Sequence, residues 1–403
     1  KKPGKYLYGV HIKDEYSKEK LDAHLYKEIT INSSIMYYNS YYDETFDEFV
    51  NKQMSKGIPV GYYGGRATRQ EVEDYSNPNN FVQLPHIEGA NKVIITGYGV
   101  NLRNTPGDGK VLDQVNMNEI YLILDESNGW YKIDVNGQTG WVSGDYAKGL
   151  YSLTHFLQVT GDNVRVRSER SLNDPSNILT HVNKGEIYTI EDELGVWYKI
   201  TANGYTGWIH NSNVIVDETI PEMLQFLNLS SEINIDVNVL NEYLKGMGTL
   251  QGQAQAFIDA SNKYDINVAY LIAHAIHETG KGTSDLSSGK LKVDGKPIYN
   301  FFGISAFDHS PDESGSNKAA EMGWYDPYSA IMGGTKWISE HYIHNTSYKQ
   351  NTLYKMKWNP DAPATHQYAT HVIWPEKIAK YMSEIYELSN DYVLIFDIPR
   401  YES

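Results

Sequence analysis

The chain has 403 residues, 40% hydrophobic and 21% charged, so it is long enough for two to four domains and too apolar for a disordered protein. The net charge is −16, and residues 215–403 alone carry 14 basic and 24 acidic residues, which argues against nucleic acid as a partner because phosphate binding needs a basic face. The lack of cysteine excludes disulfides and thiolate metal sites, and no apolar run reaches the roughly 18 residues of a membrane span, so no membrane partner is predicted.

The N-terminal segment, 1–84, is predicted to contain a strand and a helix but no complete domain. KYLYGVHI (5–12) is typical of a strand, and ETFDEFVNKQM (44–54) places Phe46, Phe49, Val50 and Met54 on one helical stripe. So few core residues do not make a convincing independent domain. Because the first residue is Lys rather than Met, we expect a processed or truncated chain, and the missing leader says little about export.

Residues 92–214 contain an internal repeat. NGWYKIDVNGQTGWV (128–142) matches GVWYKITANGYTGWI (195–209), so that Trp130 corresponds to Trp197 and Trp141 to Trp208. Upstream, GVNLRNTPG (99–107) matches NVRVRSERS (163–171). Short alternating runs broken by Gly and Asn-Gly are typical of hairpin-rich all-β domains, and about 60 residues suffice for one small barrel.

Both copies resemble bacterial SH3-like cell-wall domains, which we place at 92–150 and 156–216. The shared pattern has V-N-L/V-R near the start, W-Y-K-I in the middle and G-Y/Q-T-G-W-V/I near the end. The resemblance implies binding to peptidoglycan, often to its stem peptide or cross-bridge. The alternative is that the aromatic residues form the barrel cores and that the two domains are spacers.

The rest of the chain is predicted to be mainly helical. Apolar residues recur at spacings of three and four through 217–285, with a break at 245–248. Residues 286–325 are rich in Gly, Ser and Asp, which predicts a loop with a short hairpin, and 326–386 return to helical spacing. The tail, 386–403, contains YVLIFDI, which predicts a short strand ending at Pro399.

Glu278 is the residue whose position indicates the most chemistry. It ends the apolar run AYLIAHAI, so we expect it to lie against a core, where desolvation raises the pKa of a carboxyl group. The dipole at the C-terminal end of a helix acts in the same direction, and a raised pKa suits a general acid. Gly280 and Gly282 open the backbone to a polymer near the acid. The alternative is a solvated Glu beside a helix cap.

A metal site is the competing interpretation of the same stretch. His274, His277 and Glu278 have the order HxxHE, whereas the zinc-binding helix motif is HExxH. On a helix, His277 and Glu278 point about 100° apart, so the two side chains do not converge on one ion. We therefore predict no metal and no cofactor, and expect the histidines to lie in or beside the core.

Three blocks of the chain closely resemble the endo-β-N-acetylglucosaminidases of glycoside hydrolase family 73. They are YLIAHAIHETGKGTSDLSSG, then YNFFGISAFDHSPDESGSNKAAEMGWYDPYSAIMGGTKWISEHYI, then HQYATHVIWPEKIAKYM, together covering about 269–382. The resemblance implies a lysozyme-like fold, with a helical lobe and a small β-lobe beside a groove. It also implies cleavage of the β-1,4 bond between N-acetylglucosamine and N-acetylmuramic acid in peptidoglycan glycan strands. Glu278 occupies the position of the catalytic Glu, which as general acid protonates the departing O4.

The second catalytic group is less closely defined by the resemblance, which implies an acid from the β-lobe. Asp308 in GISAFD is the preferred candidate, with the other acids of that stretch as alternatives: Asp312, Glu313 and Glu321. Alternatively, the substrate's own 2-acetamido group attacks C1. Tyr368 in HQYAT matches a position near the reacting sugar, where a phenol orients water or the acetamido group. The family usually has Asp where this chain has His371.

Several aromatic residues stand in the same motifs and are predicted to contact substrate: Phe302, Trp324, Trp374 and Tyr342. Phe302 and Trp324 are expected to stack on a sugar face. Core packing is the alternative for these residues, and for Phe301 and Trp374 it has at least equal weight.

Segments like 45–54 and 71–81 come shortly before one like QFLNLS (225–230) in related sequences, but here the repeat separates them. We therefore predict a multidomain protein in which two all-β SH3-like barrels are inserted into a mainly helical, α+β, lysozyme-like catalytic domain at 218–385. Residues 36–84 are expected to pack on that domain, with linkers near 85–91 and 215–222. The expected location is secreted, cell-wall associated or on a phage virion. A lytic transglycosylase and a non-enzymatic wall-binding protein are the competing functions.

Overall fold

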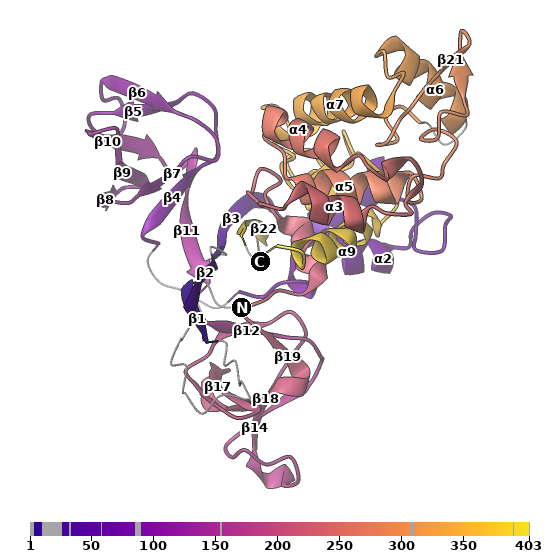
Figure 1. Ribbon diagram of the computed structural model, residues 1–403. Helices are drawn as coiled ribbons and strands as arrows, with labels where there is room; N and C mark the ends of the chain where they lie inside the picture. Colours follow the sequence, from indigo (N-terminus) through magenta and orange to yellow (C-terminus); the bar gives the residue numbers. More distant parts are fainter. Residues whose placement is uncertain are drawn as a thin grey trace, which may run out of the picture.

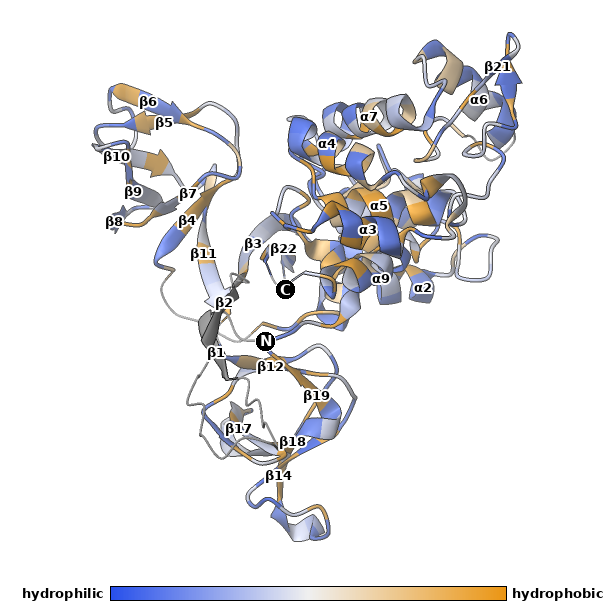
Figure 2. Cartoon of the chain, in the orientation of Figure 1, coloured by the Kyte–Doolittle hydropathy of each residue, from blue (hydrophilic) through white to orange (hydrophobic). Residues whose placement is uncertain are grey.

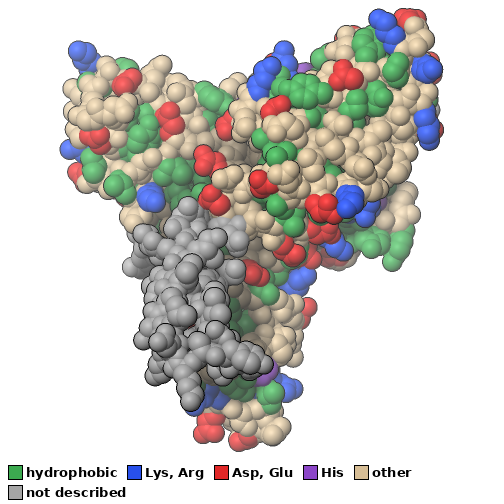
Figure 3. Space-filling view, viewed as in Figure 1, with side chains coloured by type: hydrophobic (Ala, Val, Ile, Leu, Met, Phe, Trp, Pro, Cys, Tyr) green, Lys and Arg blue, Asp and Glu red, His purple; other side chains and the backbone are tan. Residues whose placement is uncertain are grey.

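The computed structural model describes residues 4–9, 26–31, 34–57, 59–84, 90–153, 155–306, 310–389 and 391–402. A helical part and two β parts diverge from a common centre, near which both ends of the chain lie (Figure 1). Within the described residues, no helix is both long and apolar enough to cross a membrane. On the face seen in Figure 3, acidic and basic side chains are interspersed over all three parts.

The strand expected at 5–12 is present in part. Strand β1 (Gly4–Gly9) pairs antiparallel with β2 (Tyr26–Ile31), and the two form a sheet of their own. Residues 10–12 lie outside the described residues.

In the part of the chain that the structure describes, two N-terminal helices join seven from the second half. They are α1 Phe46–Lys56, α2 Arg69–Ser76, α3 Val237–Tyr243, α4 Ala254–Tyr264, α5 Val268–Glu278, α6 Pro311–Glu321, α7 Pro327–Ile338, α8 Leu353–Trp358 and α9 Trp374–Tyr386. Both N-terminal helices begin with a capping box, in which Thr45 pairs with Glu48 and Thr68 with Glu71. Local sequence thus fixes where these two helices start, although the helices they pack against come much later in the chain.

Helix α6 lies in the stretch for which the sequence predicted a loop with a short hairpin. The hairpin is present as β20 Lys292–Val293 and β21 Lys296–Pro297, but 311–321 is helical. Pro311 starts this helix, and the acidic side chains of its first turn interact favourably with the positive N-terminal end of the helix dipole. Its buried face is made of Gly315, Ser316 and Ala319. The small residues that suggested a loop are therefore those that let α6 pack closely.

The two β parts have the same strand order. In the first, the order β6-β5-β10-β9-β8 forms one sheet, and in the second, β14-β13-β18-β17-β16 forms its counterpart. The first runs through β4 Lys92–Ile95, β5 Val100–Arg103, β6 Val111–Val115, β7 Ile120–Leu122, β8 Asp125–Ser127, β9 Trp130–Val135, β10 Gln138–Ser143 and β11 Ala147–Leu153. The second runs through β12 Phe156–Val159, β13 Val164–Arg167, β14 Ile178–Val182, β15 Ile187–Thr189, β16 Asp192–Leu194, β17 Trp197–Ala202, β18 Tyr205–His210 and β19 Val214–Val216. Each has its own apolar core.

The first β part shares a sheet with one strand from the N-terminal segment and one from the C-terminal tail. Strand β3 (Ser34–Thr45) pairs with β11 on one side and with the C-terminal strand β22 (Val393–Glu402) on the other, in the order β22-β3-β11-β4-β7. The corresponding strand of the second β part, β19, has only three residues and does not reach a strand of the helical part. The first β part is therefore joined to the helical part by a continuous sheet.

Of the two predicted linkers, only the one at 215–222 is fully described by the structure. Residues 85–89 lie outside the described residues, whereas 215–222 form the end of β19 and the start of a 3₁₀ turn at 221–226. Asp217 Oδ1 accepts a hydrogen bond from the Phe156 amide at 3.0 Å, and Gln158 Oε1 accepts one from the Ile220 amide at 2.6 Å. The Asp217 contact closes the base of the second β part, and the Gln158 contact ties that part to the turn at 221–226.

Strand β22 is longer than predicted. It continues through Pro399 to Glu402, and Pro399 pairs with Ser40 of the parallel strand β3. A proline interrupts a central strand because it lacks an N–H group, but β22 lies at the edge of its sheet. The prediction that the strand ends at Pro399 was wrong because the sequence does not show which strands are edges.

One apolar core joins the N-terminal segment to the later helices. Phe49 and Val50 of α1 and Val72 of α2 are fully buried in the same cluster as the residues of α5, α8 and α9. Figure 2 shows hydrophobic residues along α5 in the middle of this part. Gln53, which the apolar stripe of α1 did not include, is 1% exposed and donates to the Trp358 carbonyl. Residues 46–82 therefore belong to the helical part.

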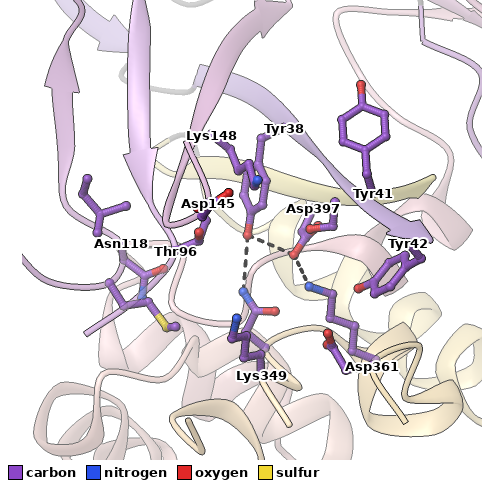
Figure 4. A pocket seen from close by; sticks show the side chains of 15 residues that line it. Tyr38, Tyr41, Tyr42, Thr96, Asn118, Asp145, Lys148, Lys349, Asp361 and Asp397 are labelled. Carbon is purple, nitrogen blue, oxygen red and sulfur yellow. Dashed lines mark hydrogen bonds and ion pairs between the residues drawn. The ribbon is translucent and has the colours of Figure 1, made fainter. Parts of the chain in front are cut away.

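A buried ion pair lies where the shared sheet meets α8. Lys355 Nζ lies 2.5 Å from Asp397 Oδ2, and the two side chains are 7% and 1% exposed. Asp397 also accepts hydrogen bonds from Tyr38 at 3.0 Å and Ser40 at 2.6 Å. Figure 4 shows this network beside a polar hollow of about 160 Å³, lined on its far side by Asp145 and Lys148 of the first β part. The carboxylate thus connects β3, β22 and α8.

Replacing Asp397 with Asn is expected to destabilise the protein by about 3–5 kcal/mol, because it leaves the Lys355 ammonium buried without its counter-charge. Urea unfolding followed by circular dichroism measures the change. The matched control is Glu242→Gln, which removes the exposed pair with Lys245 and should leave the unfolding midpoint unchanged. An equal, small effect of both substitutions would contradict the structural role of Asp397.

Candidate active site

Helix α5 places Glu278 at its last residue, as the sequence predicted. Every residue from Val268 to Ile276 is buried, and the Asn267 side chain caps the helix by accepting from the Tyr270 amide. The helix ends because Thr279 Oγ1 donates to the Ala275 carbonyl and Gly280 follows with φ +55°. Glu278 is therefore fixed on a rigid, buried element while its side chain remains 23% exposed.

Three groups surround the Glu278 carboxylate. The Trp374 indole donates to Oε1 at 2.9 Å, and His274 Nε2 lies 3.6 Å from the same oxygen. A Cβ added at Gly303 would lie only 2.8 Å from Oε2, so the backbone of this glycine lies directly against the carboxylate. At 3.6 Å the His274 contact is too long for a hydrogen bond, and we treat it as electrostatic.

The pKa of Glu278 is shifted in the direction opposite to the predicted one. Burial raises it, but His274 and His277, together with the hydrogen bond from Trp374, lower it more, so the pKa lies below the usual value of a Glu. The prediction considered only the apolar wall and the helix end. It missed that the His274 ring, one turn earlier on the same helix, lies beside the carboxylate. The residues around Glu278 therefore favour its ionised form.

Tyr368 and Trp374 form an aromatic wall beside Glu278. Their rings stack at 5.2 Å, and His274 lies 4.8 Å from Tyr368 and 5.4 Å from Trp374. The Tyr368 hydroxyl donates to the Phe302 carbonyl at 2.7 Å, and burial raises its pKa well above the usual value. Tyr342 packs against this wall with its ring tilted, 5.0 Å from Tyr368, and is 7% exposed. The structure thus brings together Glu278, Tyr368 and Trp374, with Tyr342 as support.

Phe302 and Trp324 do not have the sugar-stacking role that the sequence predicted. Phe302 is completely buried and Trp324 is 2% exposed, and both rings pack against the glycines of α7. Phe301 is also buried. Neither face of these rings is open to a sugar, so we assign the rings to the apolar core.

The segment 366–374, which carries Tyr368 and Trp374, is anchored to α8. The Tyr368 amide donates to the Met356 carbonyl at 2.9 Å, and Lys357 Nζ donates to the Thr370 carbonyl at 3.0 Å. Lys357 is fully buried, and burial lowers its pKa to about 7. These contacts fix the aromatic wall relative to Glu278.

The second predicted catalytic group, Asp308, lies outside the described residues. Of the alternatives in the same stretch, Asp312 and Glu313 form the first turn of α6, and Glu321 pairs with Lys318 at the other end of that helix. His371, which replaces the acid usual in the family, lies near His277 and has its pKa lowered by burial. None of the described carboxylates is assigned the second role.

Two glycine predictions have different outcomes. A Cβ added at Gly280 would meet Thr283 Oγ1 at 3.7 Å, an ordinary contact, so the backbone is only loosely covered there. Gly282, by contrast, is packed against the 247–250 turn, where an added Cβ would lie 2.5 Å from the Met247 carbonyl. Its role is close backbone packing, and the glycine that lies against the carboxylate is Gly303, with φ +64°, which the sequence analysis did not single out. Its place in YNFFGIS was the signal available in the sequence.

Asn300 completes this side of the site. Its side chain donates to the Ile304 carbonyl at 2.8 Å and accepts from the Ile304 amide at 3.1 Å, which fixes the turn that presents Gly303.

Among the residues that the structure places, no three His, Asp or Glu side chains gather in a way that would hold a metal ion. His274 is completely buried and its Nδ1 pairs with the Tyr270 hydroxyl at 3.0 Å.

Comparison with known proteins gives two family matches. Residues 254–387 match the glucosaminidase family, described as mannosyl-glycoprotein endo-beta-N-acetylglucosaminidase, and residues 99–148 and 162–215 each match the bacterial SH3 domain. The Beta-N-acetylglucosaminidase of Bacillus subtilis (strain 168) is 41% identical over 64% of this chain and 29% of its own length. The Bifunctional autolysin of Staphylococcus aureus (strain MSSA476) is 34% identical over 70% of this chain and 22% of its own length. The chain thus spans less than a third of these relatives.

Two solved structures are similar to about half of this chain. S. aureus Autolysin E is 35% identical, with 50% of this chain and 88% of that chain covered and a TM-score of 0.41. Another crystal structure of Autolysin E, 33% identical over 52% of this chain and 93% of that chain with a TM-score of 0.41, is a catalytic mutant in which Glu is replaced by Ala, in complex with the disaccharide NAG-NAM.

Replacing His274 with Phe is expected to raise the pKa of Glu278, because the group that lowers this pKa most is removed while burial remains. Carbon-detected NMR titration of the Glu278 carboxyl measures the shift. His341→Phe is the matched control, since His341 is exposed and stacks on Trp337. An unchanged or lower pKa in the His274 variant would show that this imidazole does not set the ionisation of Glu278.

Proposed function

The chain belongs to the glucosaminidase family through residues 254–387 and carries two bacterial SH3 domains, and from this premise we propose that it hydrolyses peptidoglycan. The bond cleaved is the β-1,4 linkage between N-acetylglucosamine and N-acetylmuramic acid. The names of the relatives, a beta-N-acetylglucosaminidase and autolysins, support this assignment. The predicted lysozyme-like fold of the catalytic domain is part of the same proposal.

The observation that carries the proposal is the position of Glu278 at the end of α5. Its carboxylate is held by Trp374, lies against the Gly303 backbone and is still partly open to solvent. In this role Glu278 protonates the oxygen of the leaving N-acetylmuramic acid as the glycosidic bond breaks. A general acid fixed on a buried helix reacts without a search for the correct geometry.

A general acid must hold a proton before it reacts, whereas the residues around Glu278 favour the carboxylate. A bound glycan strand would cover the exposed part of Glu278 and remove water from it. Burial already raises the pKa of this group, so further desolvation acts against the influence of His274 and favours the protonated form. Substrate binding would in this way prepare the acid for the reaction.

For the second catalytic role we retain Asp308, with the 2-acetamido group of the substrate as the alternative. If Asp308 activates water on the opposite face of the sugar, the product inverts at C1, whereas attack by the acetamido group retains the configuration. Tyr368 has its hydroxyl proton committed to the Phe302 carbonyl, so its oxygen is available as an acceptor for the acetamido N–H. NMR of the freshly released product distinguishes the two routes.

The two SH3 domains are proposed to bind the cell wall through its stem peptide or cross-bridge. Trp141 and Trp208 occupy corresponding positions in the two copies and are partly exposed, with Lys132 and Arg170 over their rings. The first domain is joined to the helices through β11 and β3, so wall binding there would also orient the catalytic groove. The corresponding location is extracellular or associated with the wall or a virion.

Glu278→Gln is expected to lower kcat for peptidoglycan by at least about 100-fold, because glutamine cannot donate the required proton. Release of soluble muropeptides from purified walls measures the loss, and co-sedimentation with walls should be unchanged. Glu387→Gln, at an exposed position after α9, is the matched control and should retain activity. Undiminished hydrolysis by the Glu278 variant would refute the assignment.

Mass spectrometry of the products separates the proposal from its main competitor. Hydrolysis yields reducing N-acetylglucosamine ends, whereas a lytic transglycosylase yields 1,6-anhydro-N-acetylmuramic acid ends. If the anhydro products dominate, Glu278 acts in a different reaction on the same polymer.

A further inference from the structure

Two exposed tyrosines project from the short loop between α1 and α2. Tyr63 is 95% exposed and Tyr62 is 46% exposed, with their rings edge to face at 4.8 Å. Tyr62 also lies parallel to Tyr75 of α2, with ring centroids 6.3 Å apart. We call residues 60–66 the tyrosine loop.

The tyrosine loop has a defined conformation despite its exposure. The Gly61 amide donates to the Gly65 carbonyl and the Gly64 amide to the Gly61 carbonyl, both at 3.0 Å. Glu71 Oε1 accepts from the Tyr62 amide at 2.9 Å, and its carboxylate fills the space beside Gly61. A fixed loop presents its aromatic rings without a large loss of conformational entropy on binding.

The same loop is attached to the segment that carries the aromatic wall of the active site. The Val60 amide donates to the Thr370 carbonyl and the Val60 carbonyl accepts from the Val372 amide, both at 2.9 Å. Val60 thereby pairs in parallel with His371, midway between Tyr368 and Trp374. His371 in turn lies near both the Tyr62 backbone and His277, the neighbour of Glu278. The tyrosine loop is therefore attached, through Val60, to the same segment that carries Tyr368 and Trp374.

We propose that Tyr62 and Tyr63 form a distal sugar-binding platform for the glycan strand that enters the active site. Sugar rings present flat C–H faces, and aromatic side chains with one polar end suit such faces at a wet surface. The flanking Gly64 and Gly65 leave open space beside the rings, so a polymer can approach them. This inference rests on the proposed function, because it assigns the ligand as the same strand of N-acetylated amino sugars.

The platform lies beyond the sugars that contact Glu278, so it would act only on strands long enough to reach it. A single disaccharide bound at the acid would not use it, whereas a strand of several disaccharides would. The N-terminal segment would thus contribute to the preference for long strands, and Glu71 would be a positioning residue for the loop.

The test measures strand binding in the full chain carrying Glu278→Gln, which leaves the strands uncut. Peptide-free glycan strands of one, two and four disaccharides are titrated by calorimetry, so that stem peptides do not contribute through the SH3 domains. Adding Tyr63→Ala is expected to weaken binding of the longest strand by about 5–10-fold, the range of one aromatic contact, and to leave the single disaccharide unchanged. Tyr63→Trp should restore the affinity for the longest strand.

Tyr41→Ala is the matched control, because Tyr41 is 72% exposed on β3 and points away from Asp397 and the helices in Figure 4. An equal loss at all strand lengths, no loss at any length, or the same loss with Tyr41→Ala would each overturn the platform. Failure of the proposed function has a different signature, namely that the chain with native Glu278 does not cleave the four-disaccharide strand at all.

Discussion

The parallel pairing of β3 with β22 is the constraint on which the rest of the structure depends. It joins residues 34–45 to residues 393–402 and is held at its centre by Asp397, which is paired with Lys355 and bonded to Tyr38. A charge buried to this degree is stable only with its partners in place. The pairing of these two strands therefore closes the helices that lie between them in the chain into one unit. Residues 218–385 alone lack the part of the apolar core that α1 and α2 supply.

The same pairing distinguishes two domains of nearly identical fold. Strand β11 of the first SH3 domain is extended to seven residues and adds to β3, whereas β19 of the second stops at three and is followed by Asp217. One domain is fixed to the catalytic part by a sheet that continues from β11 into β3. The other is fixed by a short parallel bridge between Gln83 and Glu186 and by Phe156 and Ile187, which lie in the core of the helical part. Their contributions to wall binding would differ for this reason, although their binding surfaces derive from the same repeat.

Local patterns in the sequence predicted local structure well. The α1 stripe, the end of α5 at Glu278 and the repeat all follow from residues close together in the chain. The sequence could not predict the edge position of β22 or its pairing with β3, because the two strands lie near opposite ends of the chain and either face of an apolar strand fits many sheets. Phe302 was misassigned because an aromatic residue looks the same in a core and in a groove until its burial is known.

The pKa of Glu278 shows that the physical reason given for this site from the sequence was incomplete. The apolar wall does act on the carboxyl group as expected, but His274, which the sequence placed one turn away as a possible metal ligand, acts in the opposite direction, and together with His277 and Trp374 it outweighs burial. An acid permanently protonated by burial would need no substrate to prepare it. An acid balanced between burial and a neighbouring imidazole responds to the removal of its remaining water, so the proposed glycan substrate, by covering Glu278, would also shift it towards the form that can donate a proton.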